Sequence, residues 1–318
     1  MRILSTFKPI EEVTEKMKKA FPDEDFIYCE DIEEALPELH NTDILLTYGE
    51  DLTSEHIEMA KNLKWIMVIS AGLELMPFKA IKEKGILVTN VRGIHKIPMA
   101  EYTFSMLLHV TKKNEKIVEQ QKNKSWDRLT HFPVSELHAK TIGVLGVGAI
   151  GGEIARLAKA FNMKVIGLNR SGQKHEFIDE MVQFDGLNYI CENADYLVSV
   201  LPSTDETKYI LNDSHFNLMK KEAIFINIGR GDLVKEEVIL RAVQNNKISH
   251  AVLDVFEQEP LPSDHPFWAL ENVTVTPHIS SKSNYYQPRS FEIFEKNLHI
   301  FIQGGSHFIN KIDVDRGY

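Results

Sequence analysis

Three residues in the last third of the chain have side chains that together can bind an anion and move a proton. Arg230 lies in "NIGRGD", Glu259 in "FEQEPLP" and His278 in "TPHIS". An arginine fork suits a planar carboxylate, and histidine exchanges protons near neutral pH, more readily as a cation when a carboxylate lies beside it. We therefore expect Arg230 to anchor and polarise an anionic substrate, Glu259 to tune the histidine, and His278 to transfer the proton.

Each of these residues follows an apolar segment that predicts a strand. The segments are 223–228, 249–255 and 272–277, and Asp254 closes the second of them. In open parallel sheets, sites form just beyond the carboxyl ends of the strands. Gly229 and Gly231 flank Arg230, and we expect them to permit an unusual backbone that directs its side chain into a cleft. Taken singly, a loop arginine or a lone histidine also suits a purely structural role.

A glycine-rich turn supplies a partner for this chemistry. "TIGVLGVGAIGGEIARLAKAF" (141–161) is a strand, a turn and an amphipathic helix, and Gly146, Gly148 and Gly151 fill the pattern G-x-G-x-x-G. The first glycine permits the tight turn, the second lets the backbone approach a pyrophosphate, and the third brings helix and strand close together. The pattern therefore predicts a dinucleotide site, and with it hydride transfer between an alcohol and a carbonyl.

The next expected strand, 164–169, ends in "LNRSG". An acid at this point would hold the ribose 2′-hydroxyl of NAD. Arg170 could instead pair with the 2′-phosphate of NADP, and Asn169 and Ser171 could donate hydrogen bonds to it. The alternative is an ordinary solvated loop arginine.

The elements that position these residues alternate along the whole chain. In the first third we expect helices at 11–21 and 53–63, and strands at 2–6, 26–29, 43–48, 65–69 and 86–90. A helix over 98–121 and a polar loop to residue 140 precede the second series, whose strands are expected at 141–146, 164–169, 181–184, 196–201, 223–228, 249–255 and 272–277. A last helix is expected at 284–303. This alternation predicts two α/β domains, each a Rossmann-like doubly wound parallel sheet, with a cleft between them.

Length and composition agree with this organisation. The chain has 318 residues, more than one core usually serves, and its net charge of −10 argues against a nucleic-acid partner. Cys29 and Cys191 lack metal-type spacing, so we expect neither a disulfide nor a metal site, and a cytoplasmic location. No stretch has the length and apolarity of a membrane span or a signal peptide, so no membrane partner is expected.

The ordered blocks over roughly 93–281 resemble the D-isomer-specific 2-hydroxyacid dehydrogenases. The blocks include "GVLGVGAIGGEIARLAKAF", "LPSTDETKYILN", "FINIGRGDLVKEEVILRAV", "AVLDVFEQEPLP" and "NVTVTPHIS". The resemblance implies that Arg230, Glu259 and His278 are the catalytic residues. It further implies substrate-carboxylate contacts from the backbone at Ala71 and Gly72, pyrophosphate contacts from Gly148, Ala149 and Ile150, and cofactor contacts from Thr103, Pro202 and Asp254.

The family also implies a division of the chain and a function. Residues 1–96 with 283–318 would form a substrate domain, and 97–282 the dinucleotide-binding domain. The long helix would belong to a homodimer interface. NAD-preferring members end the second strand with Asp, whereas "NRS" resembles the NADP-preferring glyoxylate/hydroxypyruvate reductases. We therefore expect an oxidoreductase that reduces a small 2-keto acid to the 2-hydroxy acid and favours NADP over NAD.

Three alternatives share the implied fold. A short phosphoglycerate dehydrogenase would differ in its substrate. A formate dehydrogenase would carry Gln where this chain has Glu259, which argues against it. A nucleotide-sensing protein like the carboxy-terminal-binding corepressors would keep the same catalytic residues and act by binding a protein partner, so the motifs alone do not distinguish it.

Overall fold

The computed structural model describes residues 1–70, 72–73, 75–128 and 134–316. The chain divides into two compact units, Met1–Ile94 with Ser283–Tyr318, and His95–Lys282. Two parallel α/β sheets, one in each unit, confirm the fold class expected from the strand–helix alternation. Within the described ranges, we find no helix with the length and apolar character that crossing a membrane requires.

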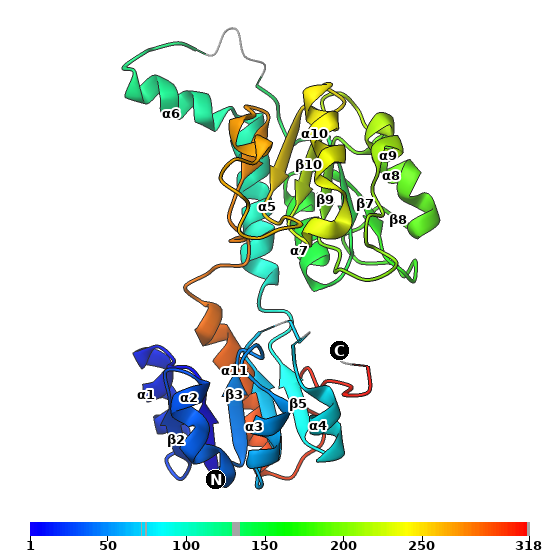
Figure 1. Ribbon diagram of the computed structural model, residues 1–318. Coiled ribbons are helices and arrows are strands. Elements are labelled where there is room, and N and C mark those ends of the chain that lie inside the picture. The colour runs from blue at the N-terminus through cyan, green and yellow to red at the C-terminus, as the bar shows by residue number, and fades with distance from the viewer. Residues whose placement is uncertain (71, 74, 129–133, 317–318) are drawn as a thin grey trace. The chain divides into compact units, whose positions relative to one another are not determined.

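The first unit is built on a five-stranded sheet in the order β2-β1-β3-β4-β5. All its strand pairs are parallel, and β3 and β4 are buried along their whole length. Its strands are β1 Arg2–Ser5, β2 Asp25–Tyr28, β3 Ile44–Thr47, β4 Trp65–Val68 and β5 Leu87–Asn90. Its helices are α1 Glu11–Ala20, α2 Ile32–Ala35, the 3₁₀ helix Leu36–Asn41, α3 Ser54–Met59, α4 Phe78–Glu83 and α11 Tyr286–Ile302. The last helix of the chain thus returns to pack in the first unit, against α1 (Figure 1).

The second unit is built on a seven-stranded parallel sheet in the order β12-β11-β10-β9-β6-β7-β8. Its strands are β6 Thr141–Leu145, β7 Lys164–Leu168, β8 Glu180–Val182, β9 Tyr196–Ser199, β10 Ile224–Asn227, β11 His250–Leu253 and β12 Val273–Val275. Its helices are α5 Lys96–Thr111, α6 Asn114–Lys122, α7 Ala149–Ala160, α8 Leu187–Asn193, α9 Asp213–Leu218, α10 Glu236–Gln244 and 3₁₀ turns at Phe184–Gly186, Gly231–Leu233 and Pro266–Ala269. The strand order reverses at β6, which pairs with β7 on one side and β9 on the other. Open α/β sheets bind ligands at such a reversal.

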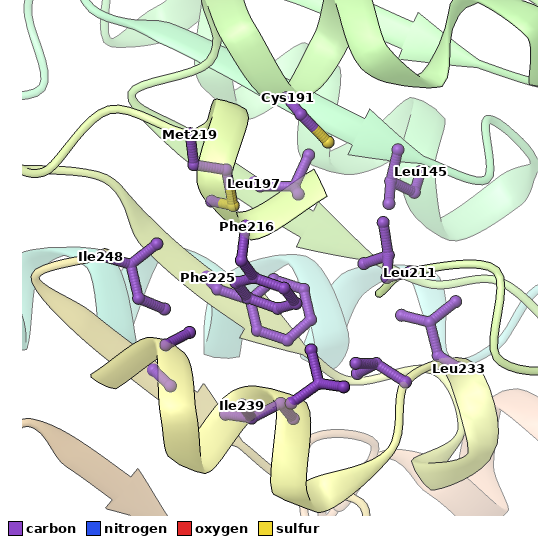
Figure 2. Close-up of a cluster of buried hydrophobic side chains, with 14 of the residues drawn as sticks. Leu145, Cys191, Leu197, Leu211, Phe216, Met219, Phe225, Leu233, Ile239 and Ile248 are labelled. Carbon is purple, nitrogen blue, oxygen red and sulfur yellow. The ribbon is translucent and has the colours of Figure 1, made fainter. Parts of the chain in front are cut away.

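Successive residues of the central strands face opposite cores, as the two-residue period of a strand requires. In β6, Val144 packs with α5 and α7 residues, whereas Leu145 packs in the cluster on the other face. Figure 2 shows that second cluster, in which Phe225 of β10 meets Phe216 of α9 edge to face, with ring centroids 5.4 Å apart. These strands therefore read as continuous apolar runs because both faces are covered.

The expected single helix over 98–121 is wrong, because the structure has two helices there. α5 ends at Thr111, and Lys113 adopts the left-handed conformation with φ 56° before α6 begins at Asn114. α5 buries one face, largely against α7, whereas α6 buries no residue and runs away from the body of its unit (Figure 1). The break therefore comes where the supporting core ends, and the helical periodicity alone did not reveal it.

Candidate active site

The sheet order brings the loops that carry Arg230, Glu259 and His278 to one edge of the second unit. β10, β11 and β12 are neighbours in the sheet and parallel, so the segments that follow them leave from the same edge. Arg230 follows β10, Glu259 follows β11, and His278 follows β12. Glu259 and His278, 19 positions apart along the chain, are thereby brought into hydrogen-bonding distance.

Glu259 and His278 form a hydrogen-bonded couple. Glu259 Oε2 lies 2.8 Å from Nδ1 of His278, and its other oxygen accepts a hydrogen bond of 3.0 Å from the backbone N–H of Phe256. The carboxylate is therefore held at both oxygens and oriented toward the ring. With Nδ1 donating to Glu259, Nε2 is the ring atom left to exchange a proton with a substrate. Both side chains are partly exposed, so a ligand can reach them.

A buried carboxylate fixes the loop that carries His278. Asp254 is completely buried, and it accepts hydrogen bonds of 2.9 Å from the backbone N–H groups of Ile279 and Ser280. It also accepts a 2.5 Å bond from the hydroxyl of Thr276. The main chain of His278 donates to the carbonyl of Asp254 at 2.9 Å and has φ 53°. Asp254 thus accepts hydrogen bonds from His278 itself and from residues on both sides of it, and so holds the backbone at this positive φ.

Tyr102 extends this arrangement from α5. Its hydroxyl lies 2.6 Å from the hydroxyl of Thr276, and burial raises the pKa of Tyr102 to about 12. No local pattern indicates Tyr102 or Thr276, because they are 174 positions apart and meet only in the fold. Asp254 had been expected to contact the cofactor, and in the structure both its oxygens are engaged by the protein itself.

Arg230 follows β10 at the same edge of the sheet as Glu259 and His278, and it is exposed. Its Nη1 donates to the carbonyl of Gly229 at 2.9 Å. Its backbone is extended, with φ −139° and ψ 147°, and neither neighbouring glycine has a positive φ. The expectation that the glycines provide an unusual backbone is therefore wrong. They provide room instead: a Cβ on Gly231 would lie 2.0 Å from the backbone of Phe256, and one on Gly229 would lie 2.6 Å from the carbonyl of Leu201.

The glycine-rich turn between β6 and α7 has the features that a pyrophosphate requires. Gly146 has φ 104°, and a Cβ on Gly151 would lie 2.2 Å from the Gly146 carbonyl oxygen. Nothing lies within 4 Å of the corresponding position on Gly148, which is exposed together with Ala149. The first turn of α7, which includes Ile150, presents backbone N–H groups at this open place. These residues fit a dinucleotide's phosphates.

The turn after β7 is organised by its own side chains. Ser171 Oγ donates to Asn169 Oδ1 at 3.3 Å, Asn169 Nδ2 donates to the Gln173 carbonyl at 3.1 Å, and Gln173 N–H donates to Ser171 Oγ at 3.2 Å. Arg170 projects outward with 79% of its side chain exposed. Its Nη2 lies 3.1 Å from Oε1 of Glu206, a residue that no motif of the sequence indicates.

The remaining expected cofactor residues differ in accessibility. Thr103 is completely buried, and its hydroxyl donates to the Met99 carbonyl at 2.8 Å. Pro202 is exposed, and its carbonyl accepts a 2.6 Å bond from the Thr207 hydroxyl. Of the two residues expected to hold the substrate carboxylate, Ala71 lies outside the described residues. Gly72, in the first unit, has its N–H bonded to Ser70 Oγ at 3.2 Å.

An apolar cavity of about 380 Å³ adjoins the Glu259–His278 couple. Trp268 forms one wall and is half exposed, with its indole Nε1 donating to the Pro262 carbonyl at 2.9 Å. The other lining residues are Phe256, Pro260, Leu261, Val275 and Pro277. The cavity combines apolar walls with a proton-exchanging pair, as small-molecule sites commonly do.

Comparison with known proteins agrees with this geometry. Residues 104–280 match the family described as "D-isomer specific 2-hydroxyacid dehydrogenase, NAD binding domain". The chain belongs to this family. The match confirms the resemblance expected from the sequence and, with it, the enzyme class, an oxidoreductase of 2-hydroxy acids with a nucleotide-binding domain.

Individual family members resemble this 2-hydroxyacid dehydrogenase over nearly its whole length. A glyoxylate reductase of Aeropyrum pernix is 32% identical over 86% of this chain and 83% of its own. A family protein of Aeromonas salmonicida has a solved structure that matches with a TM-score of 0.86 and 34% identity, covering 99% of this chain and 98% of that one. An NADPH-dependent glyoxylate/hydroxypyruvate reductase of Sinorhizobium meliloti, solved with NADP and sulfate, matches with a TM-score of 0.78 and 26% identity, covering 100% and 99%.

Another relative is considerably longer. The D-3-phosphoglycerate dehydrogenase of Methanocaldococcus jannaschii is 34% identical over 86% of this chain, but the match spans only 52% of that protein.

Proposed function

We propose that this 2-hydroxyacid dehydrogenase reduces a small 2-keto acid of the glyoxylate or hydroxypyruvate kind to the 2-hydroxy acid, with His278 as the proton donor. The observation that carries the proposal is the 2.8 Å contact between Glu259 and Nδ1 of His278. A carboxylate at this distance holds the ring through Nδ1 and leaves Nε2 as the atom that can give a proton to a keto oxygen. The same Glu argues against a formate dehydrogenase, because oxidation of formate needs no general acid.

The cofactor is proposed to bind the second unit at the turn between β6 and α7. A nicotinamide cofactor supplies the hydride when bound. The Gly146–Gly151 turn and the first turn of α7, including Gly148, Ala149 and Ile150, would hold its pyrophosphate. Pro202 would border the adenine. Asp254 remains a proposed contact of the nicotinamide end and Thr103 a proposed cofactor contact, and both are fully buried here.

Arg230 is proposed to anchor and polarise the substrate. Its guanidinium is exposed at the edge of the sheet that carries His278, so a planar carboxylate can be bound by two parallel N–H groups. The backbone N–H groups of Ala71 and Gly72 would complete the carboxylate site, as the family resemblance implies. The Arg230 guanidinium, as a fixed cationic donor, would also stabilise negative charge that develops on the keto oxygen as His278 protonates it.

NADP is proposed as the preferred cofactor over NAD. Arg170 is the outward-facing cation on the turn after β7, while Asn169 and Ser171 shape that turn and retain hydrogen-bonding capacity. The Sinorhizobium meliloti reductase with the matching fold is NADPH-dependent, which supports the proposal. If Arg170 selects the cofactor, Arg170→Ala raises the KM for NADPH far more than that for NADH and leaves kcat little changed.

Residues 1–96 with 283–318 are proposed as the substrate domain and 97–282 as the dinucleotide-binding domain. The enzyme is proposed to act in the cytoplasm as a homodimer, without nucleic-acid, membrane or metal partners. α5 is the proposed dimer helix, in keeping with the resemblance.

The deciding experiment is a panel of initial rates with glyoxylate, hydroxypyruvate, 3-phosphohydroxypyruvate and formate, each with NADPH and NADH in parallel. Turnover of the first two, fastest with NADPH, is the expected result. Turnover confined to the phosphorylated keto acid would identify the phosphoglycerate dehydrogenase alternative, which the Methanocaldococcus jannaschii relative favours. Absence of turnover on every 2-keto acid would refute the proposal and leave a nucleotide-sensing binding protein.

A further inference from the structure

Two loops on opposite sides of the glycine-rich turn meet in an ion pair. β6 lies between β7 and β9, so the loops after β7 and β9 flank the loop that follows β6. Arg170 comes from the first flanking loop and Glu206 from the second, and their charged groups are 3.1 Å apart. The pair therefore connects the two sides of the place where the adenosine end of a dinucleotide would lie.

The position of Glu206 is set by a closed turn. The hydroxyl of Thr207, which is buried, accepts a 2.9 Å bond from the Thr204 N–H and donates a 2.6 Å bond to the Pro202 carbonyl. Thr207 and Lys208 also donate backbone bonds of 3.0 and 2.9 Å to the Thr204 carbonyl. The turn opposite, around Arg170, is likewise held by its own side chains. The two charges thus face each other from ordered loops.

We infer that Glu206 is a specificity-determining residue that competes with the 2′-phosphate of NADP for Arg170. The inference rests on the proposed role of Arg170 in cofactor selection. Glu206 occupies Nη2 of Arg170, so a phosphate that binds there must take the place of the carboxylate, and one that binds the other N–H groups stands near the same negative charge. A 2′-hydroxyl is neutral, so it neither competes for the guanidinium nor is repelled by the Glu206 carboxylate. Glu206 therefore narrows the preference for NADPH that Arg170 alone would produce.

The size of the effect follows from the exposure of the pair. The side chains of Arg170 and Glu206 are 79% and 53% exposed, so solvent screens their attraction. An exposed ion pair changes an equilibrium by up to about fivefold. Repulsion between the carboxylate and a phosphate carrying about −1.5 to −2 charges adds to this. We expect Glu206→Gln to tighten binding of a 2′-phosphate about three- to tenfold.

Calorimetric titration can measure the affinity for a 2′-phosphate without any catalytic step. The probes are adenosine 2′,5′-bisphosphate and adenosine 5′-monophosphate, which differ only in the 2′-phosphate. Glu206→Gln should lower the Kd of the bisphosphate about three- to tenfold and leave that of the monophosphate within about twofold. Asp205→Asn is the matched control, because it removes one negative charge from the neighbouring exposed residue of the same turn. It should change either Kd by less than about twofold.

A second pair of variants separates the inference from the proposed function. Arg170→Ala should weaken the bisphosphate selectively, and adding Glu206→Gln to it should give a smaller gain than in the wild type. If Arg170→Ala leaves the two probes equally affected, the proposed cofactor selection fails. If Arg170→Ala acts selectively but Glu206→Gln does not change the ratio of the two Kd values, the competition by Glu206 is refuted while cofactor selection stands. If Asp205→Asn lowers the Kd of the bisphosphate as much as Glu206→Gln does, the competition by Glu206 is also refuted, because any lost negative charge on this turn would then have the same effect.

Discussion

Replacing Asp254 with asparagine should loosen the loop that carries His278. Asp254 Oδ1 accepts from Thr276 Oγ1 and the Ile279 N–H, and Oδ2 accepts from the Ser280 N–H. An asparagine of the same shape has one oxygen, so its amide NH₂ must face at least one of these donors. A buried donor left without an acceptor costs about 1–3 kcal/mol, and bonds to a charged acceptor are stronger than bonds to a neutral one. We expect the second unit to lose about 2–4 kcal/mol of stability.

The measurement combines urea unfolding with amide hydrogen exchange. Exchange at Ile279 and Ser280 should accelerate most, because their N–H groups lose the carboxylate acceptor. Turnover should fall because the loop that carries His278 is then held less firmly.

Two other variants calibrate this effect. Tyr102→Phe removes only the hydroxyl that contacts Thr276 and should cost about 1 kcal/mol of stability. Asp264→Asn is the control, an exposed acid of the same region that should stay within about 0.5 kcal/mol of the wild type. Unchanged exchange at Ile279 and Ser280 in Asp254→Asn would show that the Asp254 carboxylate does not hold this loop.

Three further predictions concern other parts of the second unit. Burial, together with Lys113 and His109, lowers the pKa of His250 from 6.5 to about 4, so the unfolded chain takes up this proton first as the pH falls. Stability should therefore decline between pH 6.5 and about 4, by at most ~3 kcal/mol from this group. His250→Gln should flatten that part of an acid-unfolding curve, and an unchanged curve would contradict the assignment. Gly151→Ala should abolish dinucleotide binding measured by nucleotide fluorescence, because its Cβ would lie 2.2 Å from the Gly146 carbonyl oxygen; retention of binding would show that the turn can shift. Burial raises the pKa of the Cys191 thiol to about 12, so a thiol reagent should label it only after unfolding, and rapid labelling of the native protein would contradict its burial.

The sequence predicted best the parts of the fold that local patterns encode. The β6–turn–α7 unit was predictable because its glycine pattern is local: Gly146 has a positive φ, Gly148 leaves open space beside the turn, and a Cβ on Gly151 would lie 2.2 Å from the Gly146 carbonyl oxygen. Long apolar runs predicted the central strands, because these strands are buried on both faces of the sheet. α5 and α6 were joined wrongly, because what ends α5 is the loss of a packing surface beyond Thr111, which helical periodicity does not express.

The site was predictable in its residue types and less so in its supports. Glu259 and His278 were paired from chemistry and resemblance, and the structure adds the 2.8 Å contact and the second anchor at the Phe256 N–H. The role of Asp254 depends on three donors that only the tertiary fold assembles. The glycines beside Arg230 were read as sources of backbone freedom, whereas neighbouring backbone segments require their lack of a side chain. Close approach between distant segments leaves no local signature in a sequence.

The turnover of His278→Asn with a 2-keto acid and NADPH tests directly whether His278 is the proton donor. Asparagine tolerates the positive φ of 53° at this position, so the loop should keep its shape. If His278 donates the proton, kcat should fall by about 10²–10⁴-fold while binding of NADPH is unchanged. Turnover within a few-fold of the wild type would show that the Glu259–His278 couple is not the general acid–base of this enzyme.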